Sequence, residues 1–261
     1  MAKGKWKAFP YKSKAYEYAG AALKKNWERL HLGDKEPFPK DEAVQEAWRA
    51  YHAGDFERAV ESGLAAGSEG WNVANKATSI YANYLETSES IKLKLFQEVI
   101  KRAEQAVAAN PKNVNGHYQR AYALGRYSQG ISVVKALAEG LGGKVKESLA
   151  TTLKLEPAHA EAHIASGTYH AEIIDKVGAM VGGLTYGAKK DTGVEHYKKA
   201  IKLHPDSAIA KIEYANGLLM MFGDSRMDEA TDLYVAASEA EPVDAMERLD
   251  VELAKSRLED E

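Results

Sequence analysis

The sequence predicts an all-α protein in which pairs of helices stack into a superhelical solenoid. Three observations support this prediction. Four of the seven prolines, Pro111, Pro157, Pro205 and Pro242, each end a similar helical phrase. The residues before and after these prolines repeat at fixed offsets, which is typical of a repeat architecture. No part of the chain alternates apolar and polar residues as a half-buried strand would.

The helix before each of these prolines carries one stripe of mostly small or apolar residues. Counted back from each proline, the stripe holds Val99, Ala103 and Ala106; Val145, Leu149 and Thr152; Gly193, Tyr197 and Ala200; and Ala230, Tyr234 and Ala237. These offsets place three side chains on one helical face, so each segment presents a similar surface to its neighbour. The proline ends the helix because it lacks an N–H and its ring clashes with the preceding turn.

A partner helix is expected after each proline. Ten residues beyond the first three prolines stand the small residues Ala121, Gly167 and Ala215, which allow two helix backbones to approach closely. Apolar residues flank each of them. Each unit is therefore a pair of antiparallel helices that repeats at a fixed offset, as in a helical solenoid.

The phrase Ala230-x3-Tyr234-x2-Ala237-x4-Pro242, preceded by Tyr214-Ala215, resembles a tetratricopeptide repeat (TPR). The phrase Gly193-x3-Tyr197-x2-Ala200-x4-Pro205, preceded by Gly167, is the next best match, and Ala47-Trp48 with the turn Ala53-Gly54-Asp55-Phe56 marks an earlier, degenerate unit. The resemblance covers about residues 43–242. The units exceed the usual length of about 34 residues, and the surplus falls at 127–143 and 173–192, where we expect longer helices or inserts.

A second resemblance rests on Asn110-Pro111, Gly116-His117-Tyr118, Ala121 and Gly125-Arg126. This phrase and the long middle inserts are similar to the TPR-like domain of the regulator of microtubule dynamics family. The resemblance implies an interaction module, and some members of the family are linked to lipid handling at membrane contacts.

We expect three regions. Residues 1–40 are basic, with ten Lys/Arg against four Asp/Glu, and contain one packed amphipathic helix with the stripe Tyr16, Ala19, Leu23, Trp27 and Leu30. Residues 41–242 form the repeat domain. Residues 243–261 form a C-terminal capping helix and an acidic tail. The oppositely charged ends are interpreted as two solvated surfaces, with head-to-tail pairing in a homo-oligomer as the alternative.

Composition excludes several classes of protein. The chain has 261 residues, of which 45% are apolar, so it is neither disordered nor collagen-like. Its net charge of −3 provides no basic field for nucleic acid. Cysteine is absent, which excludes disulfides and thiolate chemistry. No apolar run reaches the about 18–20 residues that span a membrane, and the basic start lacks an apolar signal region. We therefore expect a soluble, cytoplasmic protein without a transmembrane segment.

The concave face of the solenoid is the predicted binding site. Positions seven, eleven and fifteen after each proline should project there. They are Tyr118, Tyr122 and Arg126; Ile164, Thr168 and Glu172; and Ile212, Asn216 and Met220. Only Asn216 matches the lysines and asparagines with which TPR proteins hold a chaperone carboxylate, so that role is not expected. The aromatic and apolar set suits a protein or peptide partner, or a small apolar, lipid-like ligand. The alternative is that the inserts fill this groove.

Histidines supply a possible metal site. His159, His163 and His170 are spaced for one helical face, and divalent metals accept imidazole. The repeat register, however, aligns His163 with His117 and His170 with Leu124, which favours packed histidines. A metal site at His163 and His170 is the alternative.

Two glycine-rich segments show no catalytic motif. Residues 140–144 lack the first glycine and the Ser/Thr of a phosphate-binding loop. Residues 177–187 are interpreted as a buried linker, with a self-association contact or a flexible lid as alternatives. No nucleophile elbow is present. The sequence thus predicts a non-catalytic interaction scaffold without a cofactor; a carrier or sensor of a small apolar ligand is the second hypothesis and a metal site the third.

Overall fold

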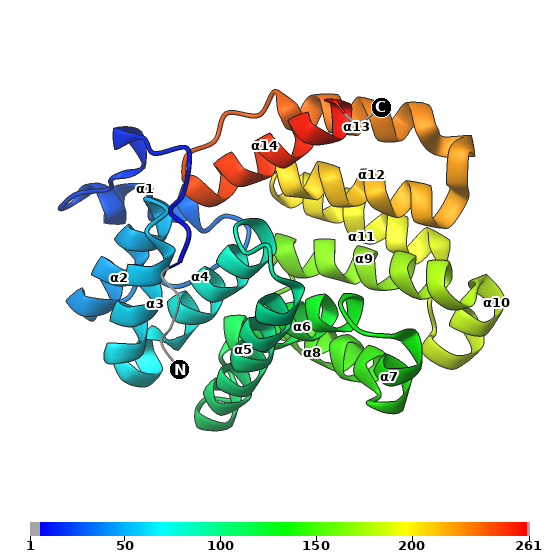
Figure 1. Cartoon of the computed structure of the whole chain (residues 1–261), viewed down its shortest axis with the longest axis horizontal. Helices are drawn as coiled ribbons and strands as arrows, with labels where there is room; N and C mark the ends of the chain where they lie inside the picture. Colours follow the sequence, from blue (N-terminus) through cyan, green and yellow to red (C-terminus); the bar gives the residue numbers. More distant parts are fainter. Residues whose placement is uncertain (1–5, 260–261) are drawn as a thin grey trace.

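The computed structural model describes residues 6–259, and within them it contains helices and turns but no strand (Figure 1). The longer helices are α1 (Ala22–Leu30), α2 (Glu42–His52), α3 (Phe56–Ala65), α4 (Trp71–Tyr84), α5 (Glu89–Ala109), α6 (Val114–Gln129), α8 (Leu141–Leu155), α9 (Ala160–Val177), α11 (Lys190–Leu203), α12 (Ala208–Phe222), α13 (Met227–Ser238) and α14 (Ala245–Glu259). Two short helices, α7 (Val133–Ala138) and α10 (Ala179–Val181), and a π-helical turn, η3 (Gly182–Tyr186), lie in the connections. The all-α prediction is confirmed.

The helices pack as successive pairs: α2 with α3, α4 with α5, α6 with α8, α9 with α11, and α12 with α13. The first members of these pairs also contact one another in series, from α2 through α4, α6 and α9 to α12. They form the inner wall of a superhelix, and the second members form its outer layer. The two expected inserts are found where the surplus length lies, with α7 between α6 and α8, and α10 and η3 between α9 and α11.

The helices that follow a proline, α2, α6, α9, α12 and α14, share one type of N-terminal cap. In each case the residue two positions after the proline accepts a hydrogen bond from a backbone N–H of the first turn. The caps are Asp41, Asn113, His159, Ser207 and Asp244, at 2.7–3.2 Å. The proline therefore precedes the start of the next helix by a fixed number of residues in all five cases.

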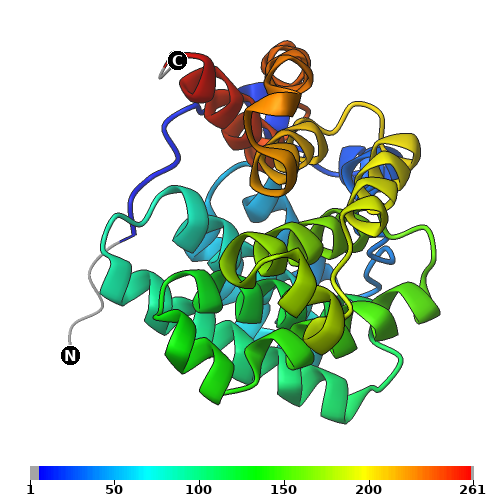
Figure 2. The ribbon, with the colours of Figure 1, turned by 90° about the vertical axis from the view of Figure 1, so that its right-hand side faces the viewer.

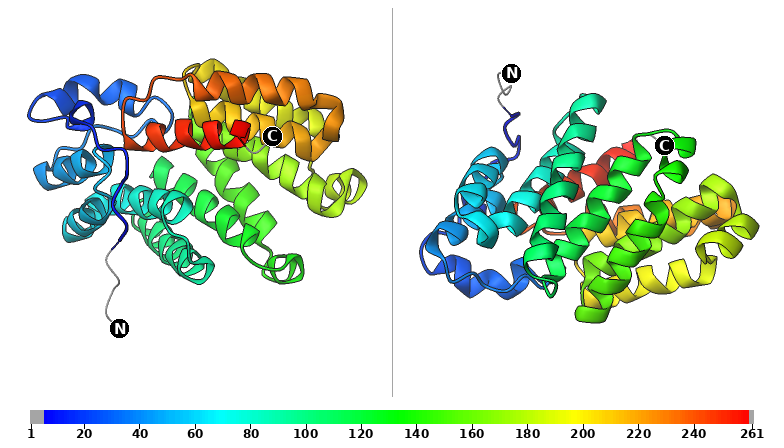
Figure 3. Two further views of the ribbon diagram at one scale, coloured as in Figure 1. Left: turned by 45° about the horizontal axis from the view of Figure 1, so that its top comes forward. Right: turned by 90° about the horizontal axis from the view of Figure 1, so that it is seen from below.

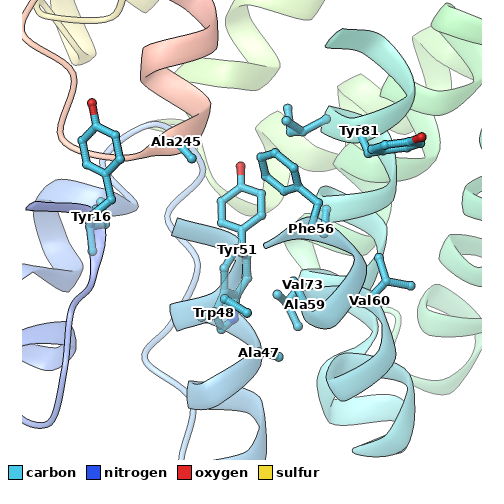
Figure 4. Packing of buried hydrophobic residues seen from close by; sticks show 14 of the residues in the cluster. Tyr16, Ala47, Trp48, Tyr51, Phe56, Ala59, Val60, Val73, Tyr81 and Ala245 are labelled. Atoms are coloured by element: carbon cyan, nitrogen blue, oxygen red, sulfur yellow. The ribbon is translucent and has the colours of Figure 1, made fainter. Parts of the chain in front are cut away.

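The N-terminal part is held by a large aromatic cluster. Trp48 and Tyr51 of α2 pack with Phe56 of α3 and with Ala245 of α14 (Figure 4). The helix expected from the stripe in residues 12–31 begins only at Ala22. Gly20 adopts a φ of +55°, outside the right-handed helical region, and interrupts it.

Helix α14 joins the two ends of the superhelix. It packs on α13 and α12, as expected for a cap, and also contacts α2. Arg29 donates two hydrogen bonds to Glu247, the shorter 2.6 Å long, and His52 Nδ1 lies 2.7 Å from Asp244. Figure 3 shows α14 crossing from the last helix pair to the N-terminal helices. The inner wall is therefore closed into a ring.

Segment 177–187 is not the buried linker favoured by its apolar sequence. Gly182 is buried and lies against Ile173, but Met180 and Leu184 are 78% and 84% exposed. Gly182 therefore packs against α9, whereas the larger apolar side chains of the segment point away from the core. No helix within residues 6–259 is long and apolar enough to cross a membrane.

Candidate functional site

The ring of inner helices encloses a cavity of about 190 Å³, hereafter the central cavity. Side chains of α4, α6, α9, α12 and α14 line it, and α7, α8 and η3 border one side. A cavity of about 150 Å³ is sufficient for benzene. The central cavity therefore has room for a ring or part of an alkyl chain.

Six of the nine predicted groove residues line the central cavity: Tyr118, Tyr122, Arg126, Ile164, Thr168 and Glu172. They come from α6 and α9, where offsets of about one turn keep each set on one face. The residues at equivalent repeat positions of α6 and α9 therefore lie on the wall of the same cavity.

The three predicted residues of α12 do not line the central cavity. Ile212 is fully buried among residues of α13 and α14. Asn216 accepts a 2.6 Å hydrogen bond from the Tyr234 hydroxyl, and Met220 packs against a neighbouring core cluster. Because α14 packs against α12, the residues that α12 presents to the cavity are instead Ile209 and Glu213.

Glu213 accepts hydrogen bonds from both neighbouring helices on one wall of the cavity. Arg126 donates to it at 3.1 Å, and the Thr168 hydroxyl donates to its other oxygen at 3.1 Å. The Arg126 guanidinium also lies over the Tyr122 ring, 5.3 Å from its centroid. These contacts neutralise the charges and connect α6, α9 and α12.

Lys76 of α4 supplies the buried cation of the opposite wall. Its ammonium donates to Asp34, and to Glu161 Oε1 at 2.8 Å. Burial acts to lower the pKa of Lys76, but the two carboxylates outweigh it and raise that pKa. The repeat register places neither Lys76 nor Glu161 among the predicted groove residues. A lysine within the mainly uncharged stretch 71–84 indicates a buried cation. No proline directly precedes α4, however, so the offsets counted from prolines do not apply to it.

The floor of the central cavity contains a polar group without a partner among the described residues. Ser79 is 2% exposed, and its hydroxyl makes no hydrogen bond. Nearby, the Tyr84 hydroxyl donates to Asp250 of α14. Burial raises the pKa of the Asp250 carboxyl well above its usual range. An unpartnered buried hydroxyl is unfavourable unless a ligand or water satisfies it.

The wall between α6, α8 and α9 is mainly apolar. It is formed by Ala121, Leu141, Val145, Ala165, Tyr169 and Ile173. Val133 and Leu137 of α7 line the same cavity and are also exposed, so the cavity meets the solvent beside α7.

The histidines considered for a metal site are held by other contacts. His163 Nδ1 lies 2.9 Å from His196 Nδ1, and His170 Nδ1 accepts a hydrogen bond from the Lys189 backbone N–H at 3.1 Å. Burial lowers the pKa of His163 and of His170. Within residues 6–259, no group of three or more His, Asp or Glu side chains is arranged to hold a metal ion.

Comparisons with known proteins agree with this architecture. A thermophilic TPR protein of Thermus thermophilus has a similar structure, with a TM-score of 0.57 and 18% sequence identity over 82% of this chain and 98% of that chain. A search of curated protein sequences finds no match. The TPR-like fold predicted from the sequence is confirmed.

The family comparison covers most of the chain. The model of the family described as regulator of microtubule dynamics protein 1-3 matches residues 70–256. This range includes α4 to α13, most of α14, and all the residues that line the central cavity. The chain therefore belongs to the regulator of microtubule dynamics protein 1-3 family.

Proposed function

We propose that this protein is a non-catalytic binding module whose central cavity takes a small ligand with an apolar chain or ring. The observation that carries the proposal is the cavity itself, with its apolar wall between α6, α8 and α9. Ligand pockets are typically concave and mostly apolar, with a few polar groups that orient the ligand. The carrier hypothesis thus fits the enclosed ring better than a long peptide groove does.

The charged side chains around the central cavity are paired with one another, which favours a ligand whose inserted part is uncharged and apolar. Arg126 is paired with Glu213, and Lys76 is paired with Glu161. A ligand that enters between these pairs does not need to supply a counter-charge. The Ser79 hydroxyl offers one hydrogen bond at the floor.

Gly125 provides a direct test. It lies on α6 and lines the central cavity, and a Cβ at this position meets no atom within 4 Å. Gly125→Leu is therefore expected to project an apolar side chain into the cavity without a clash at its Cβ, and to favour the helix by up to about 1 kcal/mol. We expect the binding of the fluorescent probe N-phenyl-1-naphthylamine, measured by titration, to be lost.

Gly143→Leu is the matched control. Gly143 lies on α8, its Cβ position is equally open, and it does not line the cavity. The control should bind the probe as the unmodified protein does. Equal binding by the unmodified protein and Gly125→Leu contradicts the proposal, as does a failure of the unmodified protein to bind. Native mass spectrometry, repeated under denaturing conditions, identifies a ligand that copurifies.

A protein or peptide partner is the second candidate. Near the exposed end of the cavity, Gln129 donates to Glu172 at 3.1 Å and Lys176 pairs with the same carboxylate. These partly exposed polar groups can exchange their present hydrogen bonds for hydrogen bonds to a peptide. The fold is also typical of interaction scaffolds. Under this candidate, Tyr122→Ala abolishes partner capture and leaves the helical circular dichroism unchanged. Unchanged capture contradicts it.

A further inference from the structure

The Ser79 hydroxyl, which makes no hydrogen bond to the described part of the chain, marks a polar end of the central cavity. Ser79 lines the cavity from α4 and is 2% exposed. Val133 and Leu137, beside which the cavity meets solvent, are 42% and 47% exposed. Figure 2 looks onto the end of the molecule that carries α7, and α4 lies behind that helix. A ligand that enters beside α7 therefore meets Ser79 with its innermost group.

Neighbouring hydroxyls find their hydrogen bonds inside the protein, and Ser79 differs from them. The Ser128 hydroxyl also lines the cavity, and it donates to the Gly125 carbonyl of its own helix at 2.7 Å. Next to Ser79 on α4, the Thr78 hydroxyl donates to the Ala74 carbonyl at 2.7 Å. Helical serines and threonines commonly bond the preceding turn in this way. Since Ser79 does not, the group that satisfies its hydroxyl is expected to come from inside the cavity.

The charges of the cavity wall disfavour an ionic group beside Ser79. Lys76, Arg126 and Lys176 are the cations among the described lining residues, and each pairs with a carboxylate. A carboxylate or phosphate on the ligand has to break one of these pairs. Burial raises the pKa of Asp250 well above its usual range, which favours the neutral acid and removes a counter-charge for an ammonium group. Because a buried charge without a counter-charge is costly, the innermost group of the ligand is uncharged.

A hydroxyl is the neutral group that matches Ser79 in either role. Two hydroxyls can each donate or accept, whereas a carbonyl can only accept. The rest of the ligand faces the apolar wall between α6, α8 and α9, to which Leu141, Val145, Ala165 and Ile173 contribute. The cavity volume of about 190 Å³ exceeds the about 150 Å³ that holds benzene, so one ring with a short chain fits.

We propose that the central cavity binds a small neutral alcohol or phenol, whose hydroxyl bonds Ser79 and whose apolar body lies against the apolar wall. The hydroxyl enters first, and the apolar body extends towards α7. This proposal rests on the proposed function, since it names the class of ligand that the cavity takes. Ser79 is then the residue that selects a hydroxyl over a charged group.

Displacement of N-phenyl-1-naphthylamine by three compounds of similar shape tests the proposal. The compounds are p-butylphenol, butylbenzene and p-butylbenzoate, which carry a hydroxyl, no polar group and a carboxylate. At pH 7 we expect p-butylphenol to bind at least about tenfold more tightly than p-butylbenzoate. Ser79→Ala should weaken p-butylphenol about fivefold, because one neutral hydrogen bond is lost, and should leave butylbenzene unchanged. The dissociation constant of the probe is measured for each variant, so that the displacement constants can be compared.

Ser128→Ala is the matched control, because it removes a hydroxyl that lines the same cavity and already has a partner. It should bind p-butylphenol as the unmodified protein does. Equal affinity of Ser79→Ala and the unmodified protein for p-butylphenol overturns the proposal. An equal loss of butylbenzene in Ser79→Ala does so too, as does p-butylbenzoate binding as tightly as p-butylphenol. If the unmodified protein binds neither the probe nor any of the compounds, the proposed function itself fails; binding that ignores Ser79 removes only the ligand class.

Discussion

His159 shows how one residue serves several parts of this molecule. Its Nδ1 caps α9, its Nε2 lies 3.0 Å from the Asn115 side-chain oxygen, and its side chain is fully buried. The neutral ring satisfies both contacts, since it accepts at Nδ1 and donates at Nε2. Burial lowers the pKa of His159 to about 3. The folded protein therefore holds this histidine neutral.

The depressed pKa of His159 makes stability depend on pH. The ordinary pKa of histidine is about 6.5, so between that pH and about 3 the unfolded chain binds a proton that the folded chain does not. This contribution to stability is present above pH 6.5 and is lost as the pH falls. His159→Asn keeps an N-cap oxygen but removes the titrating ring. We expect its loss of unfolding free energy between pH 7 and pH 5 to be about 2 kcal/mol smaller than that of the unmodified protein.

Urea unfolding at the two pH values measures this difference. His117→Asn is the control, because the ring of His117 lies near the start of α6 and bonds the Pro111 carbonyl without being buried. If both variants lose the same stability on acidification as the unmodified protein, His159 is not the group responsible.

Close approach between helices depends on glycines placed against one aromatic ring. Tyr197 of α11 is fully buried, and its ring lies between Gly167 of α9 and Gly217 of α12. A Cβ at Gly217 meets the ring at 2.5 Å, and one at Gly167 meets it at 2.8 Å. The sequence register identified Gly167 as a position of close approach; Gly217 lies two residues beyond the equivalent Ala215.

Gly217→Ala should therefore destabilise the protein by about 2 kcal/mol, although alanine favours a helix by up to about 1 kcal/mol. Gly125→Ala is the matched control, since its Cβ position is open, and it should stabilise the protein slightly. Urea unfolding measures both. In a Tyr197→Leu background the penalty at Gly217 should shrink. Equal stability of the two alanine variants would show that the ring does not restrict α12.

Closure of the ring by α14 determines the behaviour of the whole molecule. An open solenoid is stabilised by contacts between neighbouring repeats, so its ends can unfold separately. Here Leu249 of α14 belongs to the N-terminal core, whereas Val251 and Ala254 belong to the core of the last helix pair. Arg29 and Tyr84 bind the carboxylates of Glu247 and Asp250 on the same helix. The first and last repeats are therefore coupled through one element.

Two optical probes test this coupling. All four tryptophans lie between Trp6 and Trp71, so their fluorescence reports the N-terminal helices, whereas far-ultraviolet circular dichroism reports all helices. We expect the two urea transitions of the unmodified protein to coincide. Leu249→Ala should cost about 2–5 kcal/mol and separate them. Coincident transitions in the variant would show that α14 does not couple the ends; separate transitions in the unmodified protein would show the same.

The sequence by itself determined the helical pairs, their register and the two inserts. Proline spacing and one stripe per helix are local properties, and they place Tyr118, Tyr122, Ile164 and Thr168 on the inner wall. A residue two positions beyond each proline, such as Asn113, is also a recognisable cap in retrospect. Local chemistry sets these features because each involves residues within one or two helical turns.

Only the tertiary structure decided which inner faces remain accessible. Helix α14 turns back across the ring and buries Ile212, while Lys76, Asp34 and Glu161 meet from three separate parts of the chain. The exposure of Leu184 likewise depends on how its insert rests on α9. These outcomes arise from contacts between residues far apart in the sequence, which no periodicity records. The repeat pattern predicts the wall, and long-range packing determines the cavity inside it.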